Sequence, residues 1–304
     1  MKLTRRIRKK LTVDILRLGQ KHAEKGDAKS VERVRTGLRL FVRAAFPLRQ
    51  RLRTNLRCAG FEPDGLVDAY YERAIDQLMQ LLHGFRADFD MAELVENFEF
   101  DNSFGILERA YAKGKGVMVI APHLCAYPAF GCVLSSRIRC VIYSRRSQGE
   151  RKTDITDAIA KIGNVELVYP PKGATKPQRL QVAIDILRQG KILFITPDTP
   201  RKPHEGAPVS ILGKTAYFPS GVFIMAMRTG APVIPAWWHY LDGRYRIRFS
   251  EPIQLPETGK IRDKAEAGMQ QWAEQIDTFL REYPDMWWNW LDKRWTYILR
   301  DELT

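Results

Sequence analysis

The sequence predicts an α/β fold: a largely parallel mixed sheet covered by helices, with an N-terminal helical layer. From about residue 114, short apolar stretches alternate with amphipathic stretches that end at Gly163, Gly190 and Gly230. Before that point, residues 31–46 and 66–85 carry apolar side chains at helical spacing and contain few β-branched runs. Alternation of strands and helices is typical of a parallel sheet with helices on its faces.

The elements follow in a regular order. We predict strands at residues 114–122, 139–144, 165–171, 191–198, 232–240 and 245–253. Helices are predicted at 153–163, 176–190, 221–230 and 263–282, and residues 1–100 are predicted to be helical. We expect one domain over residues 1–304, made of a helical N-terminal region at 1–100, an α/β core at 110–260, and a C-terminal helix with a Trp-rich tail at 261–304.

The positive charge of the chain lies near its N-terminus. The formal net charge is +14, and residues 1–57 carry 18 Lys or Arg against four Asp or Glu. Such an arm binds nucleic acid, an anionic membrane or an acidic carrier protein, or it is simply a solvated helical face. Aromatic side chains are not interleaved with the arm, so we expect no nucleic-acid partner.

Membrane contact is predicted to be peripheral. No apolar run is long enough for a signal peptide or a membrane span. Leu11, Ile15 and Leu18 recur at helical spacing beside basic residues, so this helix lies at a membrane interface or docks on its own domain. We expect a cytoplasmic protein at the inner face of the cytoplasmic membrane. Six tryptophans of the C-terminal third either fill the core or contact lipid: Trp237, Trp238, Trp287, Trp288, Trp290 and Trp295.

Several common types of site have no sequence signature here. The four cysteines form neither a CxxC pair nor a set with zinc spacing, which favours reduced, mostly buried thiols. There is no Gly-rich phosphate loop and no GxSxG segment. We therefore expect no metal and no bound cofactor.

The polar residues most suited to chemistry follow predicted strands, where sites of α/β sheets usually form. His123 comes directly after the strand VMVIAP. The segment ITPDTPRKPHEG follows another strand and holds Asp198, Arg201 and Glu205, which could orient or polarise a polar substrate. In YSRRSQGERK, Arg145 and Arg146 could bind a phosphate by forked hydrogen bonds.

Taken in order, these segments resemble the lipid A late acyltransferases, within the wider lysophospholipid acyltransferase superfamily. The resemblance rests on LERAYAKGKGVMVIAPH, a Tyr-Ser-Arg-Arg strand end, ILRQGKILFITPD, FPSGVFIMAMRTGAPVIPAW and YPDMWWNWLDKRW. It implies acyl transfer from a thioester of acyl carrier protein or coenzyme A, as co-substrate, to a hydroxyl group. It also implies that His123 is the catalytic base, that Arg145 or Arg146 lies in a substrate-binding basic segment, and that Asp198 matches an Asp of the family.

The chain departs from the family pattern at one position. The family places Asp or Glu five residues after the catalytic His to orient the imidazole, and this chain has Pro128 there. Three interpretations follow. In the first, Asp198 or Glu205 replaces the acid; in the second, His123 acts alone with a loss of rate. In the third, the chain has lost the activity or uses a different acceptor, such as an amine. The tail also differs, with Asp292 where the family often has His.

Two functions therefore remain open at this point. The first is an acyltransferase with an atypical active site that acts on a lipid-like or secondary-metabolite acceptor. The second is a non-catalytic protein on the same scaffold that binds lipid or acyl carrier protein.

Overall fold

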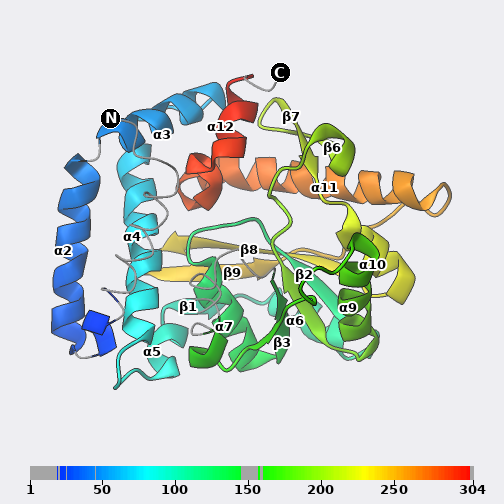
Figure 1. Ribbon diagram of the computed structural model, residues 1–304, viewed down its shortest axis with the longest axis horizontal. Helices are drawn as coiled ribbons and strands as arrows, with labels where there is room; N and C mark the ends of the chain where they lie inside the picture. Colours follow the sequence, from blue (N-terminus) through cyan, green and yellow to red (C-terminus); the bar gives the residue numbers. More distant parts are fainter. Residues whose placement is uncertain are drawn as a thin grey trace.

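Figure 1 shows the computed structural model, which describes residues 19, 21–24, 26–44, 46–144, 157 and 160–301. The basic amphipathic segment with Leu11, Ile15 and Leu18 lies outside these residues, as does most of the helix predicted at 153–163. Within the described stretches of the chain, no helix is both long enough and apolar enough to cross a membrane.

A seven-stranded mixed sheet forms the centre of the molecule, and its spatial order is β1-β9-β8-β2-β5-β3-β4. Neighbouring strands are parallel except for β8 and β9, which are antiparallel. This confirms the predicted largely parallel α/β architecture. The strands are β1 (Phe98–Phe100), β2 (Val117–Ile120), β3 (Cys140–Tyr143), β4 (Glu166–Val168), β5 (Ile192–Ile195), β8 (Val233–Leu241) and β9 (Arg244–Phe249).

Helices cover both faces of this sheet, as two consecutive tryptophans demonstrate. Side chains of successive strand residues point to opposite faces. In β8, the ring of Trp237 stacks on Phe279 of α11 (Ile261–Glu282), with centroids 5.3 Å apart. The ring of Trp238 stacks on Phe130 of α7 (Tyr127–Arg137), with centroids 4.2 Å apart. Helices α11 and α7 therefore lie on opposite faces.

The other helices frame this core. On the side of α11 lie α10 (Gly221–Thr229), which contacts it, and α9 (Lys176–Arg188), which contacts α10. The N-terminal layer consists of α2 (Ala28–Ala44), α3 (Phe46–Cys58) and α4 (Leu66–Gly84), and α2 runs beside α4 (Figure 1). Shorter elements are α5 (Met91–Val95), α6 (Phe104–Tyr111), α12 (Lys293–Leu299) and the 3-10 turns η1 (Pro203–Glu205), η2 (Pro284–Met286) and η3 (Trp288–Leu291).

Local sequence explains where these elements begin and end. All four side chains of β2 are buried, as expected for a strand covered on both faces. Gly116, just before β2, has a positive φ, and a Cβ there would lie 2.4 Å from the carbonyl oxygen of Leu187, so only glycine fits. Thr175 and Gln178 form a capping box at the start of α9.

Three features differ from the sequence prediction. Residues 98–100, expected to be helical, form β1, because they pair with β9. Strands β8 and β9 form a hairpin, whose turn residues Asp242 and Gly243 both have positive φ, the signature of a tight Asp-Gly turn. A second hairpin, β6 (Ala207–Ile211) with β7 (Lys214–Phe218), was not predicted, although its first strand alternates between buried and exposed side chains.

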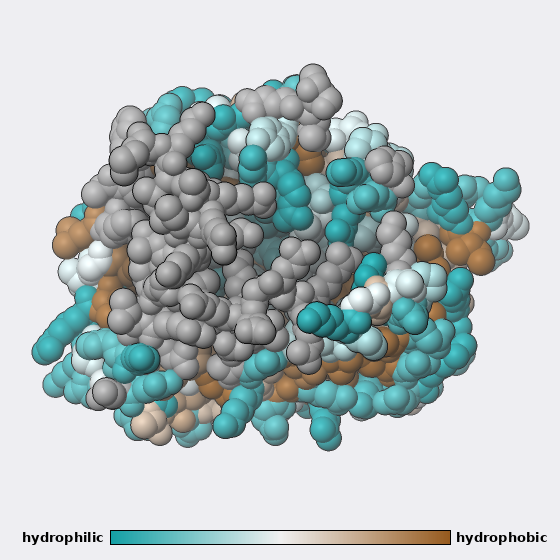
Figure 2. Space-filling model, viewed as in Figure 1, coloured by the Kyte–Doolittle hydropathy of each residue, from teal (hydrophilic) through white to brown (hydrophobic). Residues whose placement is uncertain are grey.

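The tryptophans belong to the core. Five of the six that the sequence singled out are at most 3% exposed, so of the two predicted uses, lipid contact is wrong for these five and packing is confirmed. On the face shown in Figure 2, the described side chains are mostly hydrophilic, with smaller hydrophobic areas between them.

Candidate active site

The ends of β2 and β5 bring two predicted residues together. These strands are parallel neighbours, and Ile120 pairs with Ile195. Each strand continues for three residues in a similar way, as Ala-Pro-His after β2 and as Thr-Pro-Asp after β5. His123 therefore lies three residues after Ile120, and Asp198 lies three residues after its paired residue Ile195. Both residues are at the carboxyl edge of the sheet.

The two side chains are hydrogen-bonded to each other. The Nδ1 atom of His123 contacts Oδ1 of Asp198, and the backbone N–H of His123 donates to Oδ2 at 2.9 Å. Asp198 is completely buried, whereas the His123 side chain keeps 20% of its surface exposed. The pair thus keeps its carboxylate inside and leaves the imidazole partly exposed.

The C-terminal tail holds the carboxylate in place. The indole Nε1 of Trp287 and the amide Nδ2 of Asn289 donate to Oδ2 of Asp198 at 3.0 and 2.8 Å. The indole of Trp295 donates to the backbone oxygen of Asp198 at 3.1 Å. With the ring and the backbone N–H of His123, the carboxylate therefore has four donors, which satisfies a buried charge that would otherwise be costly.

The same tail fixes the segment around His123. The backbone N–H of Trp288 donates to the carbonyl oxygen of His123 at 2.8 Å, and Cys125 N–H donates to the carbonyl oxygen of Met286 at 2.6 Å. Ala126 has a positive φ of 67°, and its N–H donates to the buried side-chain oxygen of Gln77 at 2.9 Å. These contacts with the tail and with α4 hold the loop against Asp198.

The second ring nitrogen of His123 meets a hydroxyl group. Its Nε2 lies 3.1 Å from Oγ1 of Thr196, the first residue after β5. When the ring is neutral and Nδ1–H faces the carboxylate, Nε2 is the acceptor and the Thr196 hydroxyl donates to it. This tautomer gives the pair the arrangement of a general base.

The electrostatics of the pair agree with this geometry. Burial opposes the charge on His123, but attraction to the Asp198 carboxylate and the hydrogen bond to it outweigh burial and hold the pKa of His123 above its ordinary value. Burial likewise opposes the charge of Asp198, and the contacts with His123 and Trp287 nevertheless hold the pKa of this carboxyl below its ordinary value. The pair is therefore an ion pair when His123 is protonated.

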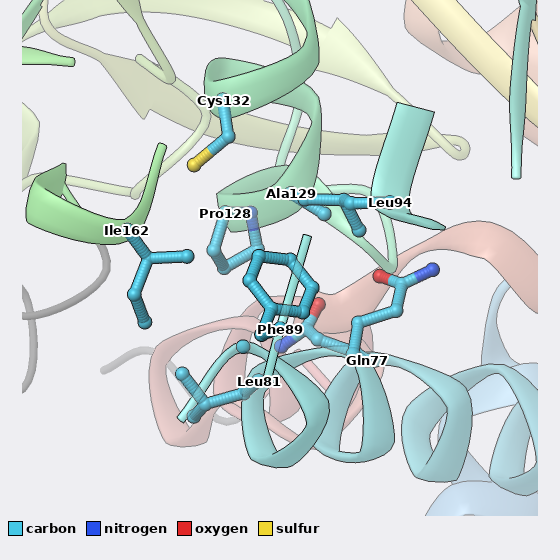
Figure 3. Close-up of a pocket in the computed structure, with 10 residues that line it drawn as sticks. Gln77, Leu81, Phe89, Leu94, Pro128, Ala129, Cys132 and Ile162 are labelled. Atoms are coloured by element: carbon cyan, nitrogen blue, oxygen red, sulfur yellow. The ribbon is translucent and has the colours of Figure 1, made fainter. Parts of the chain in front are cut away.

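Pro128 faces a different environment. It lies in the first turn of α7 and lines a mostly apolar pocket with Leu81, Phe89 and Ile162, where Figure 3 shows its ring among these side chains. Gln77 and Gln80 also line this pocket. A side chain built at position 128 therefore starts from the wall of this mostly apolar pocket. The structure places the acid that contacts His123 after β5 instead, through Asp198.

The other predicted residues have different outcomes. Arg145 and Arg146 lie outside the described residues. Arg201 and Glu205 lie between β5 and β6, and the N–H of Arg201 donates to the carbonyl oxygen of Tyr217 at 2.8 Å. Glu205 is exposed on η1, and among the described residues it forms no ion pair with His123, so of the two candidate acids only Asp198 reaches the ring.

Sequence reasoning missed Thr196, Trp287 and Asn289. The signal for Thr196 was present, because Ala-Pro-His and Thr-Pro-Asp follow two buried strands in the same way. The signal for Trp287 and Asn289 was weaker, since a Trp-rich tail is usually core packing. Nothing local in the sequence indicates that an indole N–H and an amide donate to one carboxylate.

Residues 33–297 match a family model described as bacterial lipid A biosynthesis acyltransferase. The chain belongs to the bacterial lipid A biosynthesis acyltransferase family. The match covers both strand ends and the tail that surround the pair of His123 and Asp198, and it identifies the chain as a protein of the lipid A acyltransferase type. No curated protein matches the chain significantly.

Proposed function

We propose that this member of the lipid A acyltransferase family transfers an acyl chain from a thioester of acyl carrier protein or coenzyme A to a hydroxyl group of a lipid-like or secondary-metabolite acceptor. An amine acceptor fits the same site, since a neutral amine needs less help from a base. The observation that supports this most is the hydrogen-bonded pair of His123 and Asp198, which supplies the base and the orienting acid despite Pro128.

In the proposed reaction, Nε2 of His123 removes the proton of the attacking hydroxyl as its oxygen bonds to the acyl carbon. Asp198 holds the ring in the tautomer with Nδ1–H and stabilises the imidazolium that forms. The C–S bond of the thioester then breaks, and the imidazolium returns its proton to the thiolate. No cofactor is required, because the thioester itself carries the activated acyl group.

Substrate binding is proposed for the basic and polar residues that follow β3 and β5 in the sequence. Arg145 and Arg146 follow β3, and Arg201 and Glu205 follow β5. Arginine side chains bind phosphate groups of a carrier or a lipid by forked hydrogen bonds. Peripheral contact with the inner face of the cytoplasmic membrane, through the basic N-terminal arm, belongs to the same proposal.

The geometry favours an enzyme over a non-catalytic binding protein. Binding an acyl chain requires apolar surface, not a buried carboxylate with four donors beneath a partly exposed imidazole. Such a charge is costly to bury, and catalytic sites are where that cost is commonly accepted.

The test measures transfer by the purified full-length chain. Octanoyl- and dodecanoyl-coenzyme A, and the same chains on acyl carrier protein, are supplied with a bacterial lipid extract, and acylated products are read by mass spectrometry. His123→Ala should lower the rate by about 10²–10⁴-fold, the usual contribution of a general base. The control His83→Ala removes a histidine that contacts a surface carboxylate, Glu32, and should leave the rate unchanged. A His123→Ala rate within threefold of wild type would refute the proposed base.

A further inference from the structure

A hydroxyl group of the protein lies beside the ring nitrogen of His123 that faces away from Asp198. Oγ1 of Thr196 lies 3.1 Å from Nε2 of His123, within ordinary hydrogen-bond distance. Transfer directly to an acceptor requires the acceptor hydroxyl to occupy this position. In the structure, a protein hydroxyl occupies it, held by the strand end that also carries Asp198.

Three side chains thus form a continuous chain of hydrogen bonds. The Asp198 carboxylate contacts Nδ1 of His123, and Nε2 faces the hydroxyl of Thr196. A hydroxyl, an imidazole and a buried carboxylate in this order are the arrangement that activates a nucleophile in acyl transfer. This arrangement is recognised by its geometry, irrespective of sequence spacing.

The position of Thr196 is also suited to attack. It is the first residue after β5, at the carboxyl edge of a parallel sheet, where ligands of α/β proteins bind. Its side chain is partly exposed, whereas Asp198, two residues later, is fully buried. The register of β2 and β5 fixes both residues relative to His123.

We propose that Thr196 is the nucleophile of a two-step transfer and carries the acyl chain as an ester between the steps. This rests on the proposed acyl transfer and replaces direct attack by the acceptor on the thioester with two successive attacks. In the first step, Oγ1 of Thr196 bonds to the acyl carbon while Nε2 of His123 takes the hydroxyl proton. The C–S bond breaks, and the thiolate takes this proton from His123. In the second step, His123 deprotonates the acceptor, which attacks the ester, and Thr196 leaves and regains its proton.

The two-step mechanism also accounts for the absence of an acid at position 128. An enzyme that positions its own nucleophile at the end of β5 can take the orienting acid from the same strand end, since Thr196 and Asp198 are two residues apart. An acid on α7 is then unnecessary, and position 128 serves the apolar pocket instead.

The experiment follows thiol exchange in the absence of an acceptor. Octanoyl-coenzyme A is mixed with isotopically labelled free coenzyme A and the full-length chain, and the labelled thioester is measured over time. An acyl-enzyme can return its acyl group to labelled coenzyme A, so wild type should catalyse exchange even when the ester does not accumulate. Acid-quenched samples are digested, and the peptide with Thr196 is searched for an added octanoyl group that resists neutral hydroxylamine, which separates an ester from a thioester on cysteine.

Two substitutions at position 196 separate the effect of the hydroxyl group from that of the side-chain shape. Thr196→Val keeps the shape of the side chain and removes the nucleophile, so it should lose exchange and transfer by at least about 100-fold. Thr196→Ser keeps the hydroxyl and should retain both activities. Thr215→Val, at an exposed position of β7, is the matched control and should match wild type.

Each outcome decides the proposal. Transfer by wild type without exchange refutes an acyl-enzyme and leaves the proposed function intact, as does a Thr196→Val rate within threefold of wild type. Exchange that requires Thr196 and His123 supports the nucleophile, whether or not the supplied lipid extract contains an acceptor. Neither exchange nor transfer with any of the coenzyme A or acyl carrier protein thioesters refutes the nucleophile and the proposed function together.

Discussion

Within the part of the chain that the structure describes, His83 and His123 each contact a carboxylate, yet only the contact of His123 has the character of a catalytic site. His83 of α4 lies 3.0 Å from Glu32 of α2, and its side chain is 21% exposed, nearly the same as the 20% of His123. The difference lies in the carboxylates. Glu32 is 47% exposed and also pairs with Arg35, whereas Asp198 is fully buried and held by Trp287 and Asn289.

The difference in burial between the two carboxylates shows what fixes the orientation of an imidazole. An exposed carboxylate exchanges its partners with water, and its pairing contributes little. A buried carboxylate whose oxygens are already satisfied can adopt one position only, so it fixes the ring and selects its tautomer. In this fold, the hydrogen-bond donors that hold the Asp198 carboxylate come from the C-terminal tail, more than 80 residues further along the chain.

The largest expected difference is catalytic. Asp198→Asn replaces the carboxylate with an amide, which no longer favours Nδ1–H or stabilises the imidazolium, so transfer should fall by about 10²–10⁴-fold. Glu32→Gln changes the other pair in the same way and should leave transfer unaltered. Steady-state rates with octanoyl-coenzyme A and a bacterial lipid extract measure both. Equal rates for Asp198→Asn and wild type would show that the orienting acid lies elsewhere.

The second difference concerns stability. Asp198→Ala leaves the buried donors of Trp287 and Asn289 without an acceptor, and breaking a buried pair should lower the free energy of unfolding by about 3–5 kcal/mol. Glu32→Ala removes a surface pair and should cost less than about 1 kcal/mol. Urea unfolding followed by tryptophan fluorescence gives both values. Equal losses for the two variants would contradict the role given to burial.

A third test compares position 128 with position 198. Pro128→Glu restores the residue type of the family motif, but its side chain would start from the wall of the mostly apolar pocket with Leu81 and Phe89. We expect no gain in transfer and a loss of stability of about 1–3 kcal/mol from the poorly solvated carboxyl. Pro128→Ala is the control for the loss of the proline ring. A rise in transfer for Pro128→Glu alone would show that position 128 can reach His123.

The smallest expected effect is a displacement of the pH profile. The pKa of His123 is raised, and the ring must be neutral to act as base, so transfer should rise with pH through an apparent pKa above the ordinary 6.5. The remaining activity of Asp198→Asn should rise at lower pH, because burial still disfavours the charged ring and the carboxylate no longer favours it. Besides Asp198, the charges of Asp292 and Arg294 act on the pKa of His123, in opposite directions.

The contributions of His123 and Asp198 to the free energy of unfolding also depend on pH, in opposite directions. Since folding raises the pKa of His123, its contribution is full at pH below the unfolded pKa and is lost as pH rises through the folded one. The lowered pKa of Asp198 acts in the opposite direction, because its contribution is lost as pH falls through the folded value. Rates and unfolding curves recorded from about pH 5 to 9 test the sign for His123, and unfolding curves extended to lower pH test the sign for Asp198. Glu32→Gln is the control whose transfer profile should coincide with wild type.

Much of the fold followed from the sequence because its signals are local. Apolar runs such as VMVI predicted β2, and the glycines after α9 and α10 predicted where those helices end. His123 and Asp198 were placed at strand ends for the same reason. The hairpins and β1 were missed because they depend on turn conformation and on pairing with distant strands, which apolar patterning does not encode.

The sequence by itself determined the α/β class, the family and the position of His123 at a strand end. Only the tertiary structure decided which acid accompanies it, because that depends on strand order. Strand β5 lies next to β2 although β3 and β4 come between them in the chain, and this brings residues 123 and 198 together. The same packing turns Pro128 toward an apolar pocket and places Thr196 against Nε2 of His123, since side-chain partners are set by distance in space rather than by spacing in sequence.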